Sequence, residues 1–363
     1  MEVIYAGQFA IPGTLVDSVP YGTGHINDTL ALRFRQEDGM ERRYILQRIN
    51  QFVFRKPVEV MENIERVTAH LREKILAGGG DPDRETLTLV PACSGLNYTC
   101  DAKGDFWRVY LFIEGTRTYE TAQSQEQIYK TAWAFGDFQR LLADFPAGLL
   151  HETIPNFHYT PKRFIAFQDA IARDPAGRAA GVAEEIRFLE QREGDTRILT
   201  GMLEKGILPL RVTHNDTKIN NLLVDERTGK GLCIVDLDTT MPGLAHYDFG
   251  DMVRTAAALV VEDDPDWRRA GISLENFDSL AHGYLDAARE ILTPAEIDLL
   301  AFSGRLITLE QALRFLTDYL NGDVYYKIHR AEHNLDRART QIRMVEDMEE
   351  KFAHMEAIIA KYR

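Results

Sequence analysis

Residues 211–225 read R-V-T-H-N-D-T-K-I-N-N-L-L-V-D, and residues 233–251 read C-I-V-D-L-D-T-T-M-P-G-L-A-H-Y-D-F-G-D. The first stretch contains the pattern H-x-D-x-x-x-x-N, in which the acid is Asp216 and the amide is Asn221. The second stretch places Asp236 at the end of an apolar run. A carboxylate can accept a hydroxyl proton, and carboxylate and amide oxygens are ligands that Mg²⁺ prefers. Together the two stretches predict a site that transfers a phosphoryl group to a hydroxyl.

Each acid and amide of these stretches has a predicted role. Asp216 is expected to act as the general base and therefore to contact the acceptor substrate as well. Asn221 and Asp236 are expected to bind the metal, and Asp238 is a further candidate ligand. Lys218 is interpreted either as a contact to the transferring phosphate or as a solvated side chain.

The literal triplet D-F-G at residues 248–250 lies at the start of a predicted helix, beyond the end of the apolar run. In protein kinases this triplet carries the metal-binding aspartate. Here we expect Asp248 to cap the helix or to hold the backbone of the catalytic loop, and Asp251 has the same interpretation. We expect His214 to brace the loop and to take no part in the chemistry.

Length and composition favour a cytoplasmic enzyme. The chain has 363 residues, of which 45% are apolar and 27% charged, so it can form two lobes of a globular protein. A net charge of −14 argues against nucleic acid as a partner, although a local basic pocket can still bind ATP. No apolar run reaches membrane-spanning length, and the N-terminus lacks the features of a signal peptide.

Cys93, Cys100 and Cys233 show no zinc spacing; we expect buried free thiols, with a Cys93–Cys100 bridge as the alternative.

The periodicity of the chain predicts an α+β protein with two lobes. The first lobe, residues 1–115, is expected to be β-rich with one main helix, and the second, residues 116–363, to be larger and helical. Strands are predicted over 28–35, 42–49, 86–90, 97–100 and 106–113, and a small hairpin over 221–224 and 232–235. Helices are predicted over 58–76, 124–145, 183–203, 245–261, 274–291, 294–320 and 325–362.

Two backbone segments of the first lobe predict nucleotide contacts. Gly22, Thr23 and Gly24 lie between two strand-like regions, and glycines let backbone N–H groups approach phosphates. The apolar strand that begins at Trp107 runs through Ile113 into Glu-Gly, as a strand beside an adenine pocket would. A simple core strand explains most of its residues equally well.

The cation that binds the phosphates of the nucleotide is expected on the strand over 42–49. Arg48 is the candidate, but Gln47 points to the opposite face, and the register of a strand is uncertain by one residue. Glu62 on the following helix is expected to pair with Arg48, or else to lie on the helix surface.

A polar and aromatic segment far downstream, R-F-L-T-D-Y-L-N-G-D-V-Y-Y-K, predicts contacts to a polyol. Arg314, Asp318 and Tyr325 are its polar groups. The alternative interpretation is a buried structural pair of Arg314 and Asp318.

The catalytic stretches resemble those of the aminoglycoside phosphotransferase and choline kinase-like superfamily. The resemblance implies a two-lobed, protein-kinase-like fold with ATP as co-substrate and Mg²⁺ as cofactor. It also implies a base role for Asp216 and metal roles for Asn221 and Asp236. Protein kinases carry a lysine on the third strand, where this chain has Gln47 and Arg48, so the resemblance leaves the phosphate-gripping residue open.

Four phrases resemble the N-acetylhexosamine 1-kinase subgroup of that superfamily, over roughly residues 21–350. They are G-T-G-H-I-N-D-T, Y-I-L-Q-R-I-N, V-T-H-N-D-T-K-I-N-N and V-D-L-D-T-T-M-P-G-L-A-H-Y-D-F-G-D. The resemblance implies phosphorylation of the anomeric hydroxyl of an amino sugar, with His25, Arg314 and Tyr325 as sugar contacts. Three alternatives remain: a kinase for choline, an aminoglycoside or another alcohol; a metal-dependent hydrolase; and a non-catalytic nucleotide-binding module.

Overall fold

The computed structural model describes residues 2–22 and 26–363 and divides the chain into two compact units. Unit 1 comprises Met1–Thr118, Asp144–Pro155 and Leu222–Met241, and unit 2 comprises the rest of the chain. Unit 1 thus takes in two segments beyond the first continuous stretch. The lobe boundary expected between residues 115 and 116 stays a prediction.

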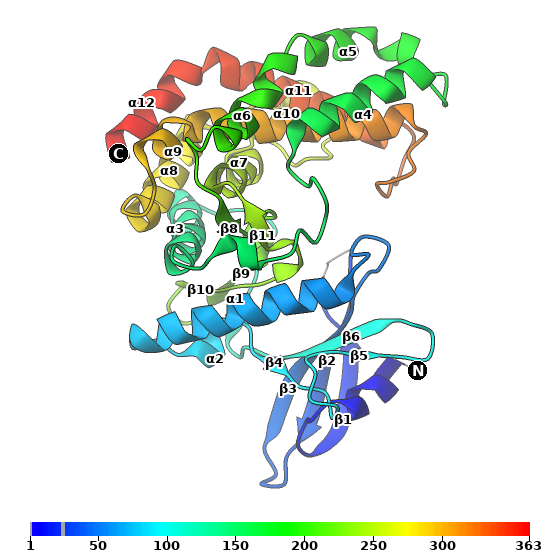
Figure 1. The fold of residues 1–363 in the computed structure, drawn as a ribbon, viewed down its shortest axis with the longest axis vertical. Coiled ribbons are helices and arrows are strands. Elements are labelled where there is room, and N and C mark those ends of the chain that lie inside the picture. The colour runs from blue at the N-terminus through cyan, green and yellow to red at the C-terminus, as the bar shows by residue number, and fades with distance from the viewer. Residues whose placement is uncertain (1, 23–25) are drawn as a thin grey trace. The chain divides into compact units, whose positions relative to one another are not determined.

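Unit 1 is built on an antiparallel sheet with the strand order β1-β2-β3-β6-β4, and β5 pairs with β6. Figure 1 shows this sheet and the long helix α1 in the blue-to-cyan part of the chain. The strands are β1 (Thr14–Pro20), β2 (Asp28–Arg35), β3 (Glu41–Arg48), β4 (Leu89–Val90), β5 (Thr99–Cys100) and β6 (Phe106–Leu111). A second sheet has the order β10 (Gly231–Ile234), β9 (Leu222–Asp225) and β7 (Thr116–Arg117). The helices are η1 (Glu2–Gln8), α1 (Pro57–Ala77), α2 (Pro82–Glu85), η2 (Ala147–Leu149) and η6 (Leu237–Thr239), where η marks a 3₁₀ helix.

The two faces of the main sheet differ in character. Tyr44 and Leu46 of β3 are buried on one face with Trp107 and Val109 of β6, where they form an apolar core. Because side chains alternate along a strand, the residues between them point to the other face. That face contains a polar pair, since Gln47 of β3 lies in register with Arg108 of β6. Helix α1 buries the stripe of apolar residues that its sequence predicts.

Unit 2 is mostly helical. Its α-helices are α3 (Gln125–Leu141), α4 (Thr160–Arg173), α5 (Ala183–Glu190), α6 (Ile198–Glu204), α7 (Ala245–Ala256), α8 (Leu274–Ala288), α9 (Pro294–Asp298), α10 (Leu300–Leu320), α11 (His333–Glu350) and α12 (Phe352–Tyr362). Its 3₁₀ helices are η3 (Ala179–Val182), η4 (Glu193–Arg197), η5 (Ile219–Asn221) and η7 (Trp267–Arg269). The short strand β8 (Arg211–Thr213) pairs with β11 (Met241–Gly243), where the chain re-enters unit 2.

Helix α10 lies at the centre of unit 2 and packs against α4, α7 and α11. Helices α7 and α10 approach closely because Gly250 has no side chain: a Cβ there would lie 2.5 Å from the carbonyl oxygen of Ser303. Helices α3 and α8 form the other extensive helix pair, with Gly283 against the backbone of Tyr129. These close contacts hold α7, which carries Asp248 and Asp251, in a rigid setting.

The α+β fold class is confirmed, and most predicted elements are present with small shifts at their ends. Three differences from the predictions are the most informative. The helix expected over 325–362 begins at His333, because the preceding segment forms turns. Helix α4 was not predicted, although it begins with a proline in its first turn, where proline is tolerated. The cysteines are free as expected, but Cys93 and Cys100 are exposed and only Cys233 is buried.

Of the helices in the described residues, none combines the length and the apolar character that crossing a membrane requires.

Candidate active site

The backbone of the catalytic loop is held by two acids of α7. Asp248 accepts hydrogen bonds from the backbone N–H groups of His214 (3.0 Å) and Asn215 (2.7 Å), and Asp251 accepts one from Thr217 (2.9 Å). The side chain of Gln139 also donates to Asp248 (2.7 Å). Burial raises the pKa of the Asp248 carboxyl, although the loop N–H groups oppose that shift. The expectation that Asp248 and Asp251 tie down the catalytic loop is confirmed.

His214 is fully buried and packs edge-on against Phe135 and Phe138 of α3. Its Nδ1 atom accepts a hydrogen bond from the backbone N–H of Asp216 (3.3 Å). Asn215, between them, adopts a left-handed conformation with φ of 65°. These contacts agree with the bracing role expected for His214, and they orient the next residue, Asp216.

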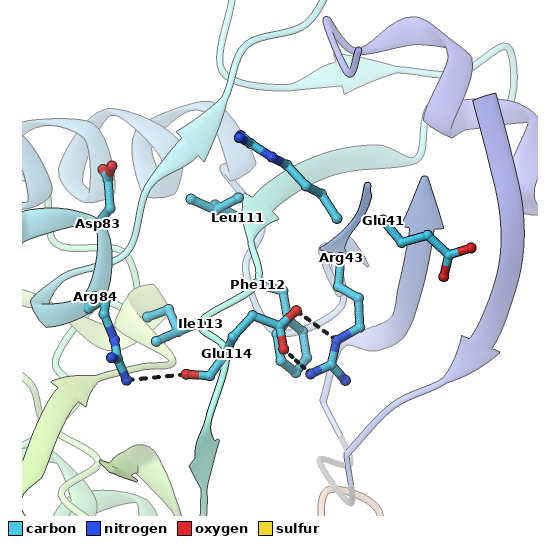
Figure 2. A pocket seen from close by; sticks show the side chains of 9 residues that line it. Glu41, Arg43, Asp83, Arg84, Leu111, Phe112, Ile113 and Glu114 are labelled. Atoms are coloured by element: carbon cyan, nitrogen blue, oxygen red, sulfur yellow. Dashed lines mark hydrogen bonds and ion pairs between the residues drawn. The ribbon is translucent and has the colours of Figure 1, made fainter. Parts of the chain in front are cut away.

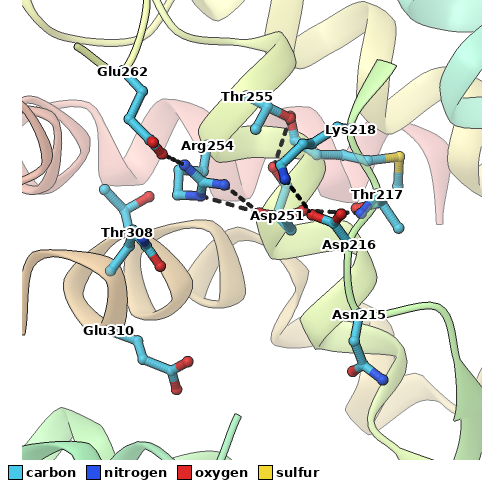
Figure 3. Close-up of polar contacts among 12 residues, drawn as sticks. Asn215, Asp216, Thr217, Lys218, Asp251, Arg254, Thr255, Glu262, Thr308 and Glu310 are labelled. Atoms are coloured by element: carbon cyan, nitrogen blue, oxygen red, sulfur yellow. Dashed lines mark hydrogen bonds and ion pairs between the residues drawn. The ribbon is translucent and has the colours of Figure 1, made fainter. Parts of the chain in front are cut away.

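The carboxylate of Asp216 lies within a small polar network, shown in Figure 3. Lys218 Nζ lies 2.8 Å from Asp216 Oδ1, and Asn221 Nδ2 donates to the backbone carbonyl (2.8 Å) and to Oδ2 (3.2 Å). Burial acts to raise the pKa of Asp216, but the charge and hydrogen bond of Lys218, together with the charge of Arg254, oppose it, and the pKa is lowered. The same ion pair raises the pKa of Lys218. The arrangement holds Asp216 as an oriented, ionised carboxylate.

Arg254 supplies positive charge next to this network. Figure 3 shows its guanidinium group between Asp251 and Glu262, with which it forms ion pairs. The positive charge of Arg254 is therefore balanced by these two carboxylates. Its structural effect is to join the acid that holds the loop, Asp251, to the segment that follows α7.

The expected metal ligands are chemically suited to Mg²⁺. Asn221 uses its nitrogen on Asp216, which leaves the carbonyl oxygen Oδ1 as the donor atom for a metal. Asp236 is exposed and adopts a left-handed conformation with φ of 59°. Both offer the oxygen donors that Mg²⁺ requires. Asn221 belongs to unit 2 and Asp236 to unit 1. Across the described part of the chain, no cluster of three or more His, Cys, Asp and Glu side chains could hold a metal.

Asp238, the further candidate ligand, lies in a different environment from Asp236. It is 1% exposed and forms an ion pair with Arg108, which is also 1% exposed. The charge of this carboxylate is thus already balanced within unit 1.

Of the predicted nucleotide contacts in the segment 22–24, the structure describes only Gly22. Gly22 adopts a left-handed conformation with φ of 79°, whereas Thr23, Gly24 and His25 lie outside the described residues. A residue with a side chain would be strained at Gly22, which is consistent with a tight turn.

The expected pair of Arg48 and Glu62 is not formed. Arg48 contacts Asp28 (2.8 Å) and Asp105 (3.3 Å), because its side chain points away from the face of β3 that carries Gln47. Glu62 lies 2.6 Å from His151, which with Arg66 lowers the pKa of the Glu62 carboxyl. The cation that lies on the same face of the sheet as Gln47 is therefore Arg108 and not Arg48.

Ile113 lines a pocket of about 310 Å³ in unit 1, shown in Figure 2. The guanidinium group of Arg43 lies 3.7 Å above the ring of Phe112 and forms an ion pair with Glu114. Arg84 donates to the backbone carbonyl of Glu114 (3.2 Å). This carbonyl therefore already accepts one hydrogen bond from within unit 1.

The expected sugar contacts of unit 2 lie near an aromatic cluster. Arg314 donates to Gln311 (3.0 Å), and its guanidinium group lies 5.4 Å from the ring centre of Phe157 and 5.7 Å from that of Tyr326. The side chain of Tyr325 is exposed.

The alternative pairing of Arg314 with Asp318 is not formed. The carboxylate of Asp318 instead accepts the backbone N–H groups of Val324, Tyr325 and Tyr326. Asp318 thus shapes the turn that follows α10.

A buried dyad of His158 and Glu310 escaped the sequence analysis. His158 Nδ1 lies 2.8 Å from Glu310 Oε1, and Nε2 lies 3.4 Å from the backbone carbonyl of Asn215. Thr160 donates to the other oxygen of Glu310 (2.7 Å). The dyad therefore connects α10, the start of α4 and the catalytic loop. A lone buried acid in an apolar helix, such as Glu310 in L-I-T-L-E-Q-A-L, was the available signal.

Comparison with known proteins places this geometry in a family. The model of the phosphotransferase enzyme family (APH) matches residues 20–288, which include the catalytic loop and Asp236. The chain belongs to the phosphotransferase enzyme family. As a member of this family it is a phosphotransferase, and Asp216 and Asp236 both lie within the matched residues.

Solved structures agree in fold. A microcompartment-associated aminopropanol kinase is 18% identical, with 97% of each chain covered and a TM-score of 0.63. An aminoglycoside phosphotransferase from Alicyclobacillus acidocaldarius is 12% identical, with 98% of this chain and 95% of that chain covered and a TM-score of 0.61. An amicoumacin kinase in complex with AMP-PNP, Ca²⁺ and its ligand is 13% identical, with 94% and 92% covered and a TM-score of 0.57. At these identities the likeness establishes the fold alone.

Proposed function

We propose that this phosphotransferase is an ATP-dependent kinase that phosphorylates the anomeric hydroxyl of an N-acetylhexosamine and releases a sugar 1-phosphate. The observation that supports the proposal is the charge and orientation of the Asp216 carboxylate. Its carboxylate is held ionised beside Lys218 and oriented by Asn221, on a loop fixed to α7. Such a carboxylate can accept and aim a hydroxyl group.

In the proposed reaction the sugar oxygen forms a bond to the γ-phosphorus, and the bond from that phosphorus to the bridging oxygen of ADP breaks. The proton of the hydroxyl passes to Asp216. The lowered pKa of Asp216 makes it a weak base, which suits an acidic hydroxyl better than an ordinary alcohol. The anomeric hydroxyl is the most acidic hydroxyl of a free sugar, so the difference in acidity between acceptor and base is smaller there than at any other sugar hydroxyl.

The nucleotide proposal rests on donor chemistry. Asn221 and Asp236 would hold Mg²⁺, which when bound neutralises charge on the transferring phosphates. Gly22, Thr23, Gly24 and Ile113 are proposed to contact ATP, with Lys218 near the transferred group. The fold relative with AMP-PNP, an ATP analogue, supports ATP as the donor.

Charges near the proposed acceptor residues favour a neutral acceptor. Neither Arg163 nor Arg314 forms an ion pair with a carboxylate of the described chain, whereas Arg163 donates only to the carbonyl of Phe157. Burial, and then the charge of Arg314, lower the pKa of Arg163. The buried carboxylate of Glu310 acts electrostatically on both arginines, so one negative charge faces two positive ones. The excess positive charge disfavours an ammonium group, and the arginines can donate to hydroxyl and acetamido oxygens.

The decisive test is product analysis with ATP and Mg²⁺ over a panel of acceptors. N-acetylglucosamine and N-acetylgalactosamine should each give a sugar 1-phosphate, identified by phosphorus NMR. Choline and an aminoglycoside serve as cationic acceptors of the same reaction class. Phosphate at the 6-position, or transfer to the cationic acceptors without transfer to either sugar, would reject the sugar assignment and leave an ATP-dependent kinase of another alcohol.

A further inference from the structure

Arg108 is the largest fully buried side chain in unit 1. It projects from the middle of β6, within the apolar run F-W-R-V-Y-L, onto the same face as Gln47 of β3. Removing a guanidinium group from water is costly unless it is fully paired and hydrogen-bonded. A position of this kind therefore requires a reason beyond packing.

Arg108 forms hydrogen bonds along both edges of its guanidinium group. Nη1 and Nη2 donate to the two oxygens of Asp238, with 2.9 Å from Nη2 to Oδ2. Nε and Nη2 donate to Gln47 Oε1 at 3.1 and 2.9 Å. Asn27 Nδ2 also donates to Asp238 Oδ2 (2.6 Å). The two-point contact fixes the direction of Asp238 as well as its charge.

Asp238 lies two residues after Asp236, in the 3₁₀ turn η6 that Asp236 begins. Asp236 is held in a left-handed conformation, which costs about 1–2 kcal/mol for a residue other than glycine. Such a conformation persists only where its surroundings hold it. Contacts of the residues that follow Asp236 can provide such a hold.

Three contacts within unit 1 provide that hold. The side chain of Asp238 is gripped by Arg108, and the backbone carbonyl of Asp238 accepts a hydrogen bond from Thr153 (3.0 Å). The carbonyl of Thr240 accepts one from Asn63 of α1 (3.0 Å). Asp236, at the start of the turn, is exposed as a residue, whereas Asp238 is buried. The turn thus carries one exposed and one buried acid.

We propose that Arg108 is a positioning residue for the metal-binding turn: through Asp238 it fixes the backbone of Asp236 so that the Asp236 carboxylate is preset for Mg²⁺. The inference rests on the proposed function, in which Asp236 binds that metal. It also removes Asp238 from the metal ligands, because both its oxygens are committed to Arg108 and Asn27. Arg108 is likewise not a phosphate contact, since its donors are engaged and it is 1% exposed.

The inference explains why β3 carries a glutamine on this face. Gln47 Oε1 accepts from Arg108, and Gln47 Nε2 donates to Thr29 Oγ1 (3.0 Å), so the amide is a neutral bridge. A lysine at residue 47 would place a second buried cation beside Arg108 with a single carboxylate to balance both. The charge that faces the metal turn therefore comes from β6 in this chain.

The test separates fold from metal binding with three variants. R108M leaves the buried carboxylate of Asp238 without its counter-ion, and R108K keeps the charge without the two-point contact. The double variant R108M/D238L removes both charges, which often restores stability because no buried charge is left without a partner. Melting temperature without ligand reports the fold, and calorimetric titration of ADP with and without Mg²⁺ reports the contribution of the metal.

We expect R108M to lower the melting temperature and the double variant to recover most of it. Both should lose about tenfold or more of the Mg²⁺-dependent gain in ADP affinity, as variants behind metal ligands do, while ADP alone binds nearly unchanged. R108K should fold and show a smaller loss. R192M, which breaks the bidentate pair of Arg192 and Glu349 in unit 2, is the control and should leave the Mg²⁺-dependent gain intact.

Two outcomes would overturn the inference. One is a double variant with wild-type Mg²⁺ dependence, which would make the pair purely structural. The other is R108K and R108M both binding Mg²⁺ with ADP as the wild type does. The variant D236A tests the proposed function separately. If D236A leaves the Mg²⁺-dependent gain in ADP affinity unchanged, Asp236 does not bind the metal. The inference about Arg108 would then be wrong because the proposed function is wrong.

Discussion

The side-chain amide of Asn221 donates to Asp216 twice, at 2.8 Å to the backbone carbonyl and at 3.2 Å to the carboxylate. The amide nitrogen is thereby committed, and because the amide group is planar its oxygen points away from Asp216. One side chain thus orients the proposed base and leaves its own oxygen as the donor atom for the proposed metal. The function of each of these two residues depends on the other.

Asp216→Asn should lower kcat by about 10²–10⁴-fold, since it removes the charged acceptor for the hydroxyl proton. The fold and ADP binding should persist, because an amide can keep part of the hydrogen bonding to Lys218 and Asn221. Steady-state kinetics and a thermal melt check both points. Asp169→Asn, at an exposed acid of α4, is the matched control. Retention of more than about a tenth of wild-type kcat, which corresponds to only ~1.4 kcal/mol, would contradict the base assignment.

Asp236→Ala and Asp248→Ala should fail in different ways. Asp236 is exposed, so its loss should weaken binding of ADP with Mg²⁺ and leave the melting temperature nearly unchanged. Asp248 is buried against the N–H groups of His214 and Asn215, and each unpaired buried group costs about 1–3 kcal/mol. Its loss should therefore lower the melting temperature first. A crystal structure with Mg²⁺ and nucleotide in which Asp248, and not Asp236, contacts the metal would refute this division.

Arg314→Ala should raise KM for N-acetylglucosamine far more than KM for ATP. The variant removes a donor from the aromatic setting of Phe157 and Tyr326, and buried polar partners left unpaired cost more than lost apolar contact. Initial rates with each substrate varied in turn give the two constants. Arg173→Ala, at an exposed arginine that ends α4, controls for the loss of positive charge. Equal changes in both KM values would count against a sugar contact.

Stability should fall as the pH drops from about 6.5 toward 4, and His246 should contribute to that fall. Burial lowers the pKa of His246 to about 4, and its Nε2 atom lies 3.0 Å from the backbone carbonyl of Glu296. The unfolded chain, with a histidine pKa near 6.5, then binds more protons than the folded chain in this window, so acid favours unfolding. The contribution lost between pH 7 and pH 5 is about 2 kcal/mol.

Denaturant unfolding at pH 7 and pH 5 measures this effect. His246→Gln keeps a donor for the Glu296 carbonyl and cannot be protonated, so its stability should change less between the two pH values than that of the wild type. An identical pH dependence in both proteins would show that His246 does not titrate in this way.

Gly283→Ala should destabilise the protein, because a Cβ there would lie 2.2 Å from the carbonyl oxygen of Tyr129 on α3. Helices α3 and α8 would have to separate, and overpacking of this kind costs about 1–3 kcal/mol or more. Gly201→Ala, in α6 with nothing within 4 Å of the added Cβ, should be neutral or stabilising by up to about 1 kcal/mol. Melting temperatures of the two variants give the comparison, and equal values would refute the close-packing argument.

The sequence predicts the elements of this fold well where periodicity is strong. The stripe of α1 and the alternation of β2 and β3 mark elements whose bounds agree with the structure to within one residue. The turn before α11 was missed because Asp318, a residue far back on α10, supplies the acceptors for its N–H groups. No local pattern encodes a partner at that separation.

The assignment of Arg48 shows the same limit within the site. An arginine at the end of a strand predicted a cation near the nucleotide, and that contact stays a prediction. Register decides which face of the sheet the arginine occupies, and a shift of one residue moves it to the other face. In the structure Gln47 shares its face with Arg108, and Arg48 pairs with Asp28 and Asp105 on the other side.

By itself the sequence determined the fold class and the family of this protein, together with a small set of oxygen-bearing residues from which its reaction can be proposed. These follow from local patterns: periodicity of apolar residues, and acids and amides at a short fixed spacing. Only the tertiary structure decided which buried polar side chains face each other, as Arg108 faces Asp238 and His158 faces Glu310. The physical reason is that a buried polar group must find its partner in space, and here the partners are more than a hundred residues apart in the chain.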